Sequence, residues 1–394
     1  MTSERTQVAI VGAGPAGLLL SHLLFRQGID SVVVELRSRE HIEARVRAGV
    51  LEHATTELLD EVGLGARMRR EGLAHHGIEL RFDRTAHRIA LTELTGGRGI
   101  TLYGQQEVVK DLVAARMAAG GDIRFEATDV TLAAVDGDGP SLTFRHDGKD
   151  VELRCDVIAG CDGFHGVCRD SIPQGSLTTY QRDYPFGWLG ILAAVAPSSD
   201  ELVYTYTDRG FALLSMRSPD VSRLYLQVAP DEDIANWPDN RVWDELHVRL
   251  ATDDGWSLTE GPVLEKGITA MRGFAVAPMR HSRLFLAGDA AHIVPPTGAK
   301  GMNLAIADVA MLADALTTWY RSGDQTGLDG YSAAALRRVW RAQHFSWWMT
   351  SMLHRFPDDD AYQVELQLSQ LRYIASSTAA ATSLAENYVG LPYS

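Results

Sequence analysis

The stretch Gln7-Val-Ala-Ile-Val-Gly12-Ala-Gly-Pro-Ala-Gly17 decides the fold of this chain. Its first five residues are mainly apolar and β-branched, which is typical of a buried strand. Three glycines with G-x-G-x-x-G spacing follow, and a helical stretch from Leu18 to Gln27 ends before Gly28. Ser31 to Glu35 then form a second apolar strand. The order of these segments predicts a βαβ unit and hence a parallel sheet.

The glycine loop is expected to bind the pyrophosphate of a dinucleotide. Gly12 permits the tight turn, Gly14 lets the backbone approach the phosphates, and Gly17 lets the helix pack on the strand. The free N–H groups at the start of the helix attract an anion. Glu35, 18 residues after Gly17, would accept hydrogen bonds from ribose hydroxyls. The motif by itself does not separate FAD from NAD.

Composition narrows the class of protein. The chain has 394 residues and a formal net charge of -14. This charge disfavours binding to nucleic acid or to an anionic membrane, because both need a basic surface. No apolar run approaches the roughly 18 residues of a membrane span, and we expect no signal peptide. The spacings of Cys155, Cys161 and Cys168 fit neither a zinc site nor a redox pair. We therefore expect no metal and a cytoplasmic setting.

Two further motifs indicate which dinucleotide is bound. In residues 283–303 an apolar strand leads into Gly288-Asp289, then a loop rich in proline and glycine, then a helix. This segment resembles the GD motif of FAD-dependent aromatic hydroxylases, and Ala159-Gly-Cys-Asp162-Gly163 resembles their DG motif. The second match departs from the family at Gly166, where a serine is expected, although Arg169 is present. Three motifs in the order of this family favour FAD over NAD.

The predicted fold is α/β, with a Rossmann-like FAD-binding domain on a parallel sheet, a substrate domain on a mixed β-sheet, and a C-terminal helical region. Alternating segments within 77–103 and 184–230 indicate the second sheet, and helical spacing begins after residue 303. The expected limits are 1–76, 104–180 and 270–315 for the FAD-binding domain, 77–103 and 181–269 for the substrate domain, and 316–394 for the helical region.

The resemblance covers nearly the whole chain and is most specific in stretches such as Tyr184-Pro-Phe-Gly-Trp-Leu-Gly and His344-Phe-Ser-Trp-Trp-Met-Thr. The resemblance is strongest to the members of the family that hydroxylate 4-hydroxybenzoate to 3,4-dihydroxybenzoate. It therefore implies the same reaction for this chain. Arg217 would bind the substrate carboxylate, because a guanidinium fork matches a planar carboxylate. Ser215 and Tyr225 would add hydrogen bonds to the same group.

The resemblance also implies a path for the phenolic proton of the substrate. Tyr204 would contact the phenol oxygen, with Tyr388 behind it and His75 at the outer end, and Pro296 would offer its backbone carbonyl. Removal of the proton makes the ring a better nucleophile, which is general-base catalysis. Taken singly, each of these side chains has an ordinary structural explanation. Their joint match to one pocket is what supports the roles.

The implied FAD site is larger than the glycine loop and Glu35. Its further members are Arg45, Arg47, Gln105, Asp162, Arg223, Asp289, Thr297, Gly298, Gly301, Met302 and Asn303.

The reductant and the partners follow from the same resemblance. NADPH-specific members carry an Arg-Gln pair after the glutamate of the second strand and a tyrosine beyond it, whereas this chain has Leu36-Arg37 and His41. We therefore expect NADH to be used, alone or alongside NADPH. The expected partners are a small aromatic acid and O₂, and the family implies a homodimer. Two alternatives stay open: another ring, such as 3-hydroxybenzoate or 3,4-dihydroxybenzoate, and a nucleotide-binding module without turnover.

Overall fold

The glycine-rich N-terminal region lies in a six-stranded sheet of order β19-β20-β13-β2-β3-β9. The computed structural model describes residues 2–45, 49–137 and 139–393. All neighbouring strands of this sheet are parallel except β19 and β20. Its strands are β2 (Val8–Val11), β3 (Ser31–Val34), β9 (Asp122–Arg124), β13 (Val157–Gly160), β19 (Arg280–His281) and β20 (Leu284–Leu286). The two strands predicted around the glycine loop are thus confirmed.

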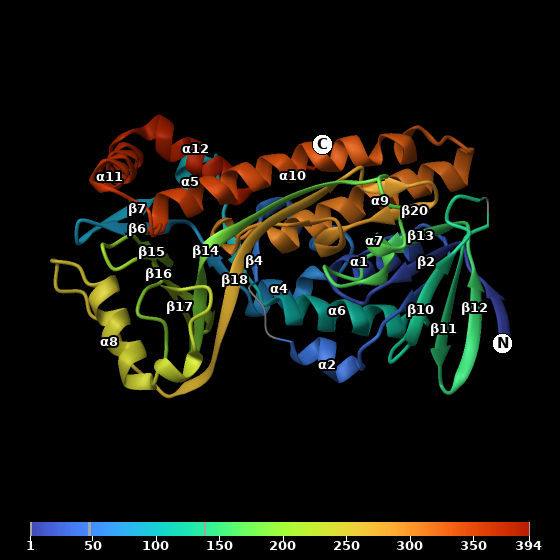
Figure 1. Cartoon of the computed structure of the whole chain (residues 1–394), viewed down its shortest axis with the longest axis horizontal. Helices are drawn as coiled ribbons and strands as arrows, with labels where there is room; N and C mark the ends of the chain where they lie inside the picture. Colours follow the sequence, from blue (N-terminus) through green and yellow to red (C-terminus); the bar gives the residue numbers. More distant parts are fainter. Residues whose placement is uncertain (1, 46–48, 138, 394) are drawn as a thin grey trace.

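Three helices share the hydrophobic core of this sheet, namely α1 (Pro15–Arg26), α6 (Gln105–Ala118) and α9 (Gly301–Ser322). Helix α1 packs against both of the others (Figure 1). The sequence predicts Leu18 as the first residue of α1, but the helix begins at Pro15. Proline suits the first helical position, since it has no N–H that would need a partner there.

An eight-stranded mixed sheet of order β21-β18-β14-β17-β16-β15-β6-β7 forms the second large layer. Its strands are β6 (Ile78–Phe82), β7 (Thr85–Ile89), β14 (Thr178–Ala193), β15 (Leu202–Thr205), β16 (Ala212–Ser218), β17 (Val221–Val228), β18 (Val263–Ala277) and β21 (His292–Ile293). One face packs against α8 (Asp239–Leu250). The long strands β14 and β18 reach from this sheet toward the parallel sheet (Figure 1).

Two smaller sheets complete the β structure. One contains β1 (Thr2–Arg5), β10 (Thr128–Ala133), β11 (Ser141–His146) and β12 (Lys149–Arg154), and the other contains β4 (Val50–Leu51), β5 (Leu73–His75) and β8 (Ile100–Leu102). The sequence predicts a meander over 123–160, and β10 to β12 form one. Strand β13 instead joins the parallel sheet, because its four residues are fully buried and pair with β2 and β20.

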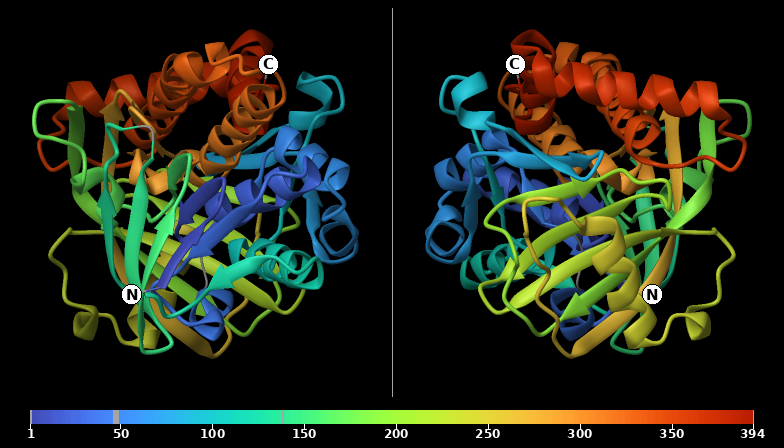
Figure 2. Two further views of the ribbon diagram at one scale, coloured as in Figure 1. Left: turned by 90° about the vertical axis from the view of Figure 1, so that its right-hand side faces the viewer. Right: turned by 90° about the vertical axis from the view of Figure 1, so that its left-hand side faces the viewer.

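The chain is helical toward its C-terminus, as predicted. Helix α10 (Thr326–Leu353) runs along the top of Figure 1, followed by α11 (Ala361–Ser376) and α12 (Thr378–Val389). The predicted single helix over 361–386 is broken at Ser377, whose extended backbone starts a new helix and whose hydroxyl accepts from Ala380 N at 3.4 Å. Both views of Figure 2 place these helices on one side of the molecule.

Short helices connect the larger elements: α2 (Arg39–Ala44), α3 (His53–Glu61), α4 (Gly65–Glu71), α5 (Leu91–Leu94), α7 (Val167–Asp170), η1 (Ile234–Asn236), η2 (Gly288–Ala290) and η3 (Pro296–Gly298). Among the described residues, no helix has the length and apolar character needed to cross a membrane. The domain limits given above remain a prediction.

Candidate active site

The glycine loop between β2 and α1 leaves room for a ligand at one glycine only. Gly12 has φ +100°, and a Cβ there would lie 2.4 Å from the Cys161 carbonyl oxygen. A Cβ on Gly17 would lie 2.0 Å from the Gly12 oxygen, whereas one on Gly14 would meet nothing within 4 Å. No side chain caps the start of α1. The structure therefore leaves backbone N–H groups beside open space, which is the arrangement that binds a phosphate.

Glu35 follows β3 and holds the backbone of the loop in place. Its Oε2 accepts from Ala13 N at 2.7 Å, and its Oε1 accepts from Arg37 N at 2.8 Å. Each carboxylate oxygen can accept a further hydrogen bond. The side chain thus supports the glycine loop and retains acceptor capacity for a ribose.

The DG segment after β13 contains a buried acceptor without a partner. Asp162 Oδ2 accepts from Cys168 N at 2.8 Å, while Asp162 Oδ1 has no partner among the described groups. Burial raises the pKa of this carboxyl group. A Cβ at Gly166 would lie 2.1 Å from Asp162 Cγ, so the serine that the family pattern places there would require the Asp162 side chain to move.

The GD segment forms η2, which carries Asp289. Asp308 on α9 braces this turn: its Oδ2 accepts from Gly288 N at 2.9 Å and lies 2.6 Å from His292 Nε2. Burial lowers the pKa of His292, but the Asp308 carboxylate outweighs this and raises the pKa overall. Sequence reasoning assigned no role to either residue: Asp308 lies outside the motifs, and His292 lies within the GD segment without being singled out.

The next loop forms η3 and leads into α9. Thr297 Oγ1 lies 2.9 Å from Thr350 Oγ1 on α10, and a Cβ on Gly298 would lie 2.6 Å from Ser346 Oγ. The loop is therefore packed tightly against α10. Gly301 opens α9, a Cβ there would meet nothing within 4 Å, and no side chain caps this helix start. Half-buried Met302 follows it.

Asn303 fixes the η3 loop to the β4–α3 connection. Its Oδ1 accepts from Glu52 N and from Thr55 Oγ1, both at 2.9 Å. Its Nδ2 donates to the carbonyls of Val50 (2.9 Å) and Ala299 (3.0 Å). These four hydrogen bonds tie the η3 loop to the residues around β4 and α3.

A buried ion pair that the sequence did not reveal lies beside Asn303. Lys300 Nζ lies 2.7 Å from Glu52 Oε1 and donates to the Tyr388 carbonyl at 2.8 Å. Burial lowers the pKa of Lys300.

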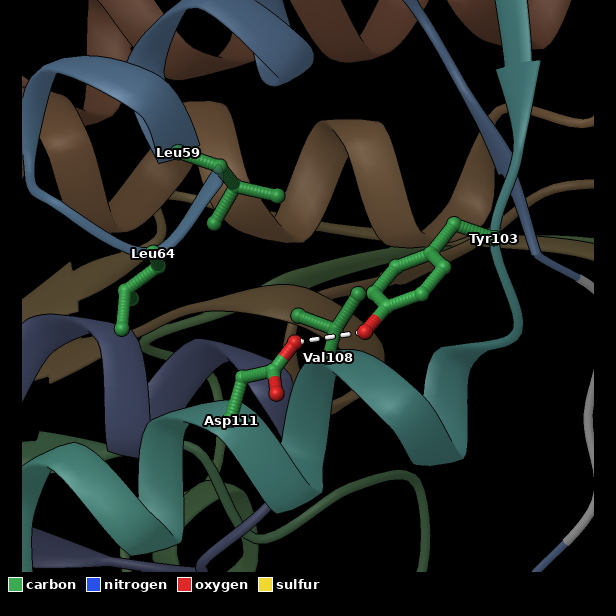
Figure 3. A pocket seen from close by; sticks show the side chains of 5 residues that line it. All are labelled: Leu59, Leu64, Tyr103, Val108 and Asp111. Atoms are coloured by element: carbon green, nitrogen blue, oxygen red, sulfur yellow. Dashed lines mark hydrogen bonds between the residues drawn. The ribbon is translucent and has the colours of Figure 1, made fainter. Parts of the chain in front are cut away.

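Gln105, a predicted FAD contact, is the first residue of α6. The preceding Tyr103 donates its hydroxyl to Asp111 at 2.6 Å and its backbone N–H to the Gly49 carbonyl at 2.7 Å. Figure 3 shows this Tyr103–Asp111 hydrogen bond in a small pocket that Leu59, Leu64 and Val108 also line. Arg45 follows the last residue of α2. Arg47 lies outside the described residues.

The predicted substrate residues lie on three neighbouring strands and share one face of the eight-stranded sheet. Tyr204 on β15 pairs with Leu213 on β16, and Leu213 pairs with Tyr225 on β17. Ser215 pairs with Arg223, and Arg217 lies two residues beyond Ser215. Because side chains alternate between faces along a strand, the pairing brings Tyr204, Ser215, Arg223 and Tyr225 to the same side. Arg217 lies where the register shifts between Met216 and Ser218, and its electrostatic interactions with Tyr225 and Arg223 place it close to them.

Two arginines on this face have buried nitrogens without partners among the described residues, Arg217 Nε and Arg223 Nε. Burial lowers the pKa of Arg217, with Arg223 contributing in the same direction and Tyr225 opposing it. The Arg223 guanidinium carbon lies 5.2 Å from the centroid of the Tyr225 ring. A buried cation is stable when an anion pairs with it, so this face fits a ligand with a carboxylate.

The two tyrosines predicted to relay a proton are in contact. Tyr204 and Tyr388, on β15 and α12, are 2% and 1% exposed, and their hydroxyl oxygens are 2.5 Å apart. Burial raises the pKa of both phenols. Among the described residues no hydrogen bond joins His75 to either tyrosine, and His75 Nδ1 is buried without a partner. Burial lowers the pKa of His75 to about 4, so the ring is neutral near pH 7.

These features fit bound FAD. The uncapped starts of α1 and α9 offer N–H groups to a pyrophosphate and to a flavin ring. Asp162 Oδ1 is a buried acceptor that has no partner within the described part of the chain, and Glu35 retains acceptor capacity for a ribose. The residues implied to contact FAD would supply these groups. Arg217 lies apart from them on β16, near the face suited to an organic acid.

Comparison with known proteins agrees with this geometry. A family model described as FAD binding domain matches residues 5–346. The p-hydroxybenzoate hydroxylase of Acinetobacter baylyi is 49% identical over 393 residues, covering 100% of this chain and 97% of that protein. The 3-amino-4-hydroxybenzoate 2-monooxygenase of Streptomyces platensis is 26% identical over 341 residues, covering 80% of this chain and 81% of that protein.

A solved structure shows the same fold. The p-nitrophenol 4-monooxygenase of Pseudomonas putida superimposes with a TM-score of 0.84 at 20% identity and covers 99% of both chains. The matched family model and the full-length relative together show that this chain belongs to the FAD binding domain family, among its FAD-dependent aromatic monooxygenases.

Proposed function

We propose that this protein hydroxylates 4-hydroxybenzoate to 3,4-dihydroxybenzoate, using FAD, a reduced nicotinamide and O₂. One observation carries the proposal: half-buried Arg217, whose buried Nε has no partner among the described residues, lies near Tyr225 on the same face of the sheet as Tyr204, and Tyr204 is hydrogen-bonded there to Tyr388 of α12. A ligand that suits both has a carboxylate at one end and a phenol at the other. The relative from Acinetobacter baylyi is named for such a compound, p-hydroxybenzoate.

The carboxylate end of the substrate would be bound by Arg217, Ser215 and Tyr225. The guanidinium supplies two parallel N–H groups to the two carboxylate oxygens. Ser215 Oγ has only a long contact, 3.5 Å, with the Met216 carbonyl, so its hydroxyl can turn to a substrate. This arrangement favours planar acids over neutral phenols, because a neutral group would leave the arginine unpaired.

At the phenol end, Tyr204 would accept the proton of the substrate and pass one on through Tyr388. The raised pKa values of the two tyrosines keep both protonated at rest, so each can release one proton as it takes another. His75, neutral near pH 7, would be the outer acceptor. The Pro296 carbonyl already accepts from Ala299 N at 2.9 Å, and its second lone pair remains for the phenol.

FAD, when bound, supplies the reduction of O₂ and the transfer of one oxygen to the ring. The protein contributes orientation, a closed apolar wall and removal of the phenolic proton. The buried side chains around Tyr204 would exclude water. They include Trp188, Phe211 and Leu213, all at most 5% exposed.

The finer assignments are part of the same proposal. NADH is the expected reductant, alone or alongside NADPH, because Leu36-Arg37 and His41 replace the residues of NADPH-specific members. A cytoplasmic setting is supported by three buried free cysteines. A homodimer is supported by Tyr362, Leu366 and Tyr373 on α11, which are 72%, 53% and 60% exposed and would be covered by a second copy.

An oxygen-uptake assay with a panel of hydroxybenzoates tests the function. Purified FAD-loaded protein should consume O₂ and NADH with 4-hydroxybenzoate and yield 3,4-dihydroxybenzoate, with much slower turnover of 3-hydroxybenzoate and of 3,4-dihydroxybenzoate itself. Comparison of kcat/KM for NADH and NADPH tests the reductant. Product formed only from another ring, or NADH oxidation without any hydroxylated product, would reject the proposal.

A further inference from the structure

A histidine outside the predicted catalytic set lies behind the wall of the substrate face. His354 follows the last residue of α10 and is 0% exposed. Its imidazole stacks between Phe186, with centroids 4.7 Å apart and planes at 10°, and Phe211, at 4.3 Å and 20°. Contact on both sides of the ring fixes its plane.

Both ring nitrogens of His354 take part in hydrogen bonds. Trp188 Nε1 lies 2.7 Å from His354 Nε2, and the two rings are within 9° of parallel. His354 Nδ1 lies 3.1 Å from the Thr350 carbonyl oxygen. An indole N–H can only donate, so Nε2 accepts and Nδ1 carries the proton. The histidine is therefore neutral and in one tautomer, consistent with a pKa that burial lowers to about 3.

Trp188 in turn borders the residues proposed to bind the substrate. It lies on β14, and its ring is 4.9 Å from that of Tyr225 and 5.0 Å from that of Phe211, nearly parallel to the latter at 12°. Its single polar hydrogen is bound to His354. The indole beside Tyr225 therefore has no free hydrogen-bond donor to offer.

Helix α10, which ends just before His354, also contacts the η3 loop predicted to face the flavin. Ser346 and Thr350 on α10 and His354 just after it recur at four-residue spacing, and all three are 0% exposed. Thr350 contacts Thr297 of η3, while its carbonyl oxygen lies at hydrogen-bonding distance from His354 Nδ1. One buried edge of α10 thus connects η3 to the Trp188 wall.

We propose that His354 is a positioning residue that fixes Trp188 as the rigid apolar wall beside Tyr225 and thereby sets the affinity for the aromatic substrate. The inference rests on the proposed function, since it assumes that the aromatic acid binds on this face. A histidine that served only to fill the core would not need an acceptor for the indole, and its replacement would change stability without changing substrate affinity.

The test is a substrate titration of oxidised FAD-loaded protein, followed through the change in flavin absorption that 4-hydroxybenzoate causes. His354→Leu should raise the Kd about tenfold, because Trp188 loses the acceptor that fixes its ring and the wall beside Tyr225 is no longer held in one position. His354→Gln, which retains an acceptor oxygen, should recover part of this loss. In turnover, KM should rise by more than kcat falls.

Trp188→Phe completes a double-mutant cycle and is the milder change if His354→Leu does not fold. It should raise the Kd, and combining it with His354→Leu should add little, since both remove the same hydrogen bond. Trp243→Phe is the matched control, because Trp243 is a buried tryptophan on α8, against the opposite face of the sheet. It should leave the Kd unchanged.

Unchanged Kd values in folded His354→Leu and Trp188→Phe, or fully additive effects in the double variant, would overturn the inference. The wild type separates this result from failure of the function itself. If the wild type forms 3,4-dihydroxybenzoate while the variants bind normally, only the role of His354 fails. If the wild type forms no product, the proposed function fails.

Discussion

On the face of the eight-stranded sheet that meets α8, the strands carry aliphatic side chains such as Leu214 and Leu224, which are 0% and 1% exposed. On the opposite face, the neighbouring residues of the same strands are Ser215, Arg223 and Tyr225. Burial alternates along the whole of β17. Side chains along a strand point alternately to the two faces of the sheet. One strand can therefore stabilise the fold with every second residue and contact a ligand with the residues in between. The face against α8 also holds a few buried polar residues, and two of them, Arg81 and Ser222, donate to the backbone carbonyls of Leu250 and Val195 rather than facing a ligand.

Truncation on the packing face should have the largest effect. Leu214→Ala should lower the free energy of unfolding by about 2–5 kcal/mol, since it removes a fully buried leucine and leaves a cavity. Chemical denaturation of the FAD-loaded protein would measure this loss. The Kd for 4-hydroxybenzoate should stay nearly constant. A large change in that Kd would show that the two faces are not independent.

Loss of one hydroxyl on the other face should affect chemistry instead. Tyr204→Phe should cut hydroxylation about 100-fold, in the range attributed to a general base, with substrate binding nearly intact and more H₂O₂ released per NADH. The ratio of 3,4-dihydroxybenzoate formed to NADH consumed measures the effect. Tyr206→Phe is the control, because this buried tyrosine bonds Gln367 at 3.1 Å rather than Tyr388. Normal hydroxylation by Tyr204→Phe would disprove the relay.

Arg217→Lys should act on binding. The loss of a charged, two-pronged hydrogen bond should weaken substrate binding by about 2–3 kcal/mol, or roughly 30- to 150-fold in Kd. The uncharged analogue 4-hydroxybenzamide supplies the comparison, because its affinity does not depend on a carboxylate. An equal loss for both ligands would argue for a general distortion of the face, and an unchanged Kd for the acid would exclude the carboxylate clamp.

The smallest effect concerns pH. His75 has its pKa lowered from 6.5 to about 4 by burial, so below pH 6.5 the unfolded chain binds a proton that the folded protein does not. Stability is therefore lost as the pH falls from 6.5 toward 4, by about 1.4 kcal/mol per pH unit. His75→Gln should lose less stability than the wild type between pH 7 and pH 5.5. Parallel pH profiles of unfolding free energy would contradict this.

Local patterns predicted the elements well where side-chain periodicity and glycine spacing dominate. The βαβ unit, the helical C-terminus and the alternating strands of the second sheet follow from residue order alone. Two details could not be foreseen. Ser377 divides the last helical stretch through its backbone conformation, and β13 joins the parallel sheet because it pairs with β20, which lies more than 120 residues later.

The candidate site was predictable as a set of residues but not as an arrangement. The resemblance to a family identified Tyr204, Arg217 and Asn303 as candidate site residues. Their roles remain proposals. Asp308, which braces the Gly288 turn, and His354, which contacts Trp188, were given no role from the sequence. The sequence does not show whether a histidine is buried or which groups its two ring nitrogens contact.

By itself, the sequence determined a parallel dinucleotide-binding layer, since the glycine spacing permits few other backbones, and it determined which strand residues share a face. The tertiary structure decided which groups meet across the chain. Tyr204 and Tyr388 are 184 residues apart, and Trp188 and His354 are 166 residues apart, yet each pair is in hydrogen-bonding contact. Local propensity acts over a few residues, whereas such contacts depend on how α10 and α12 pack over the sheet, which only the folded chain defines.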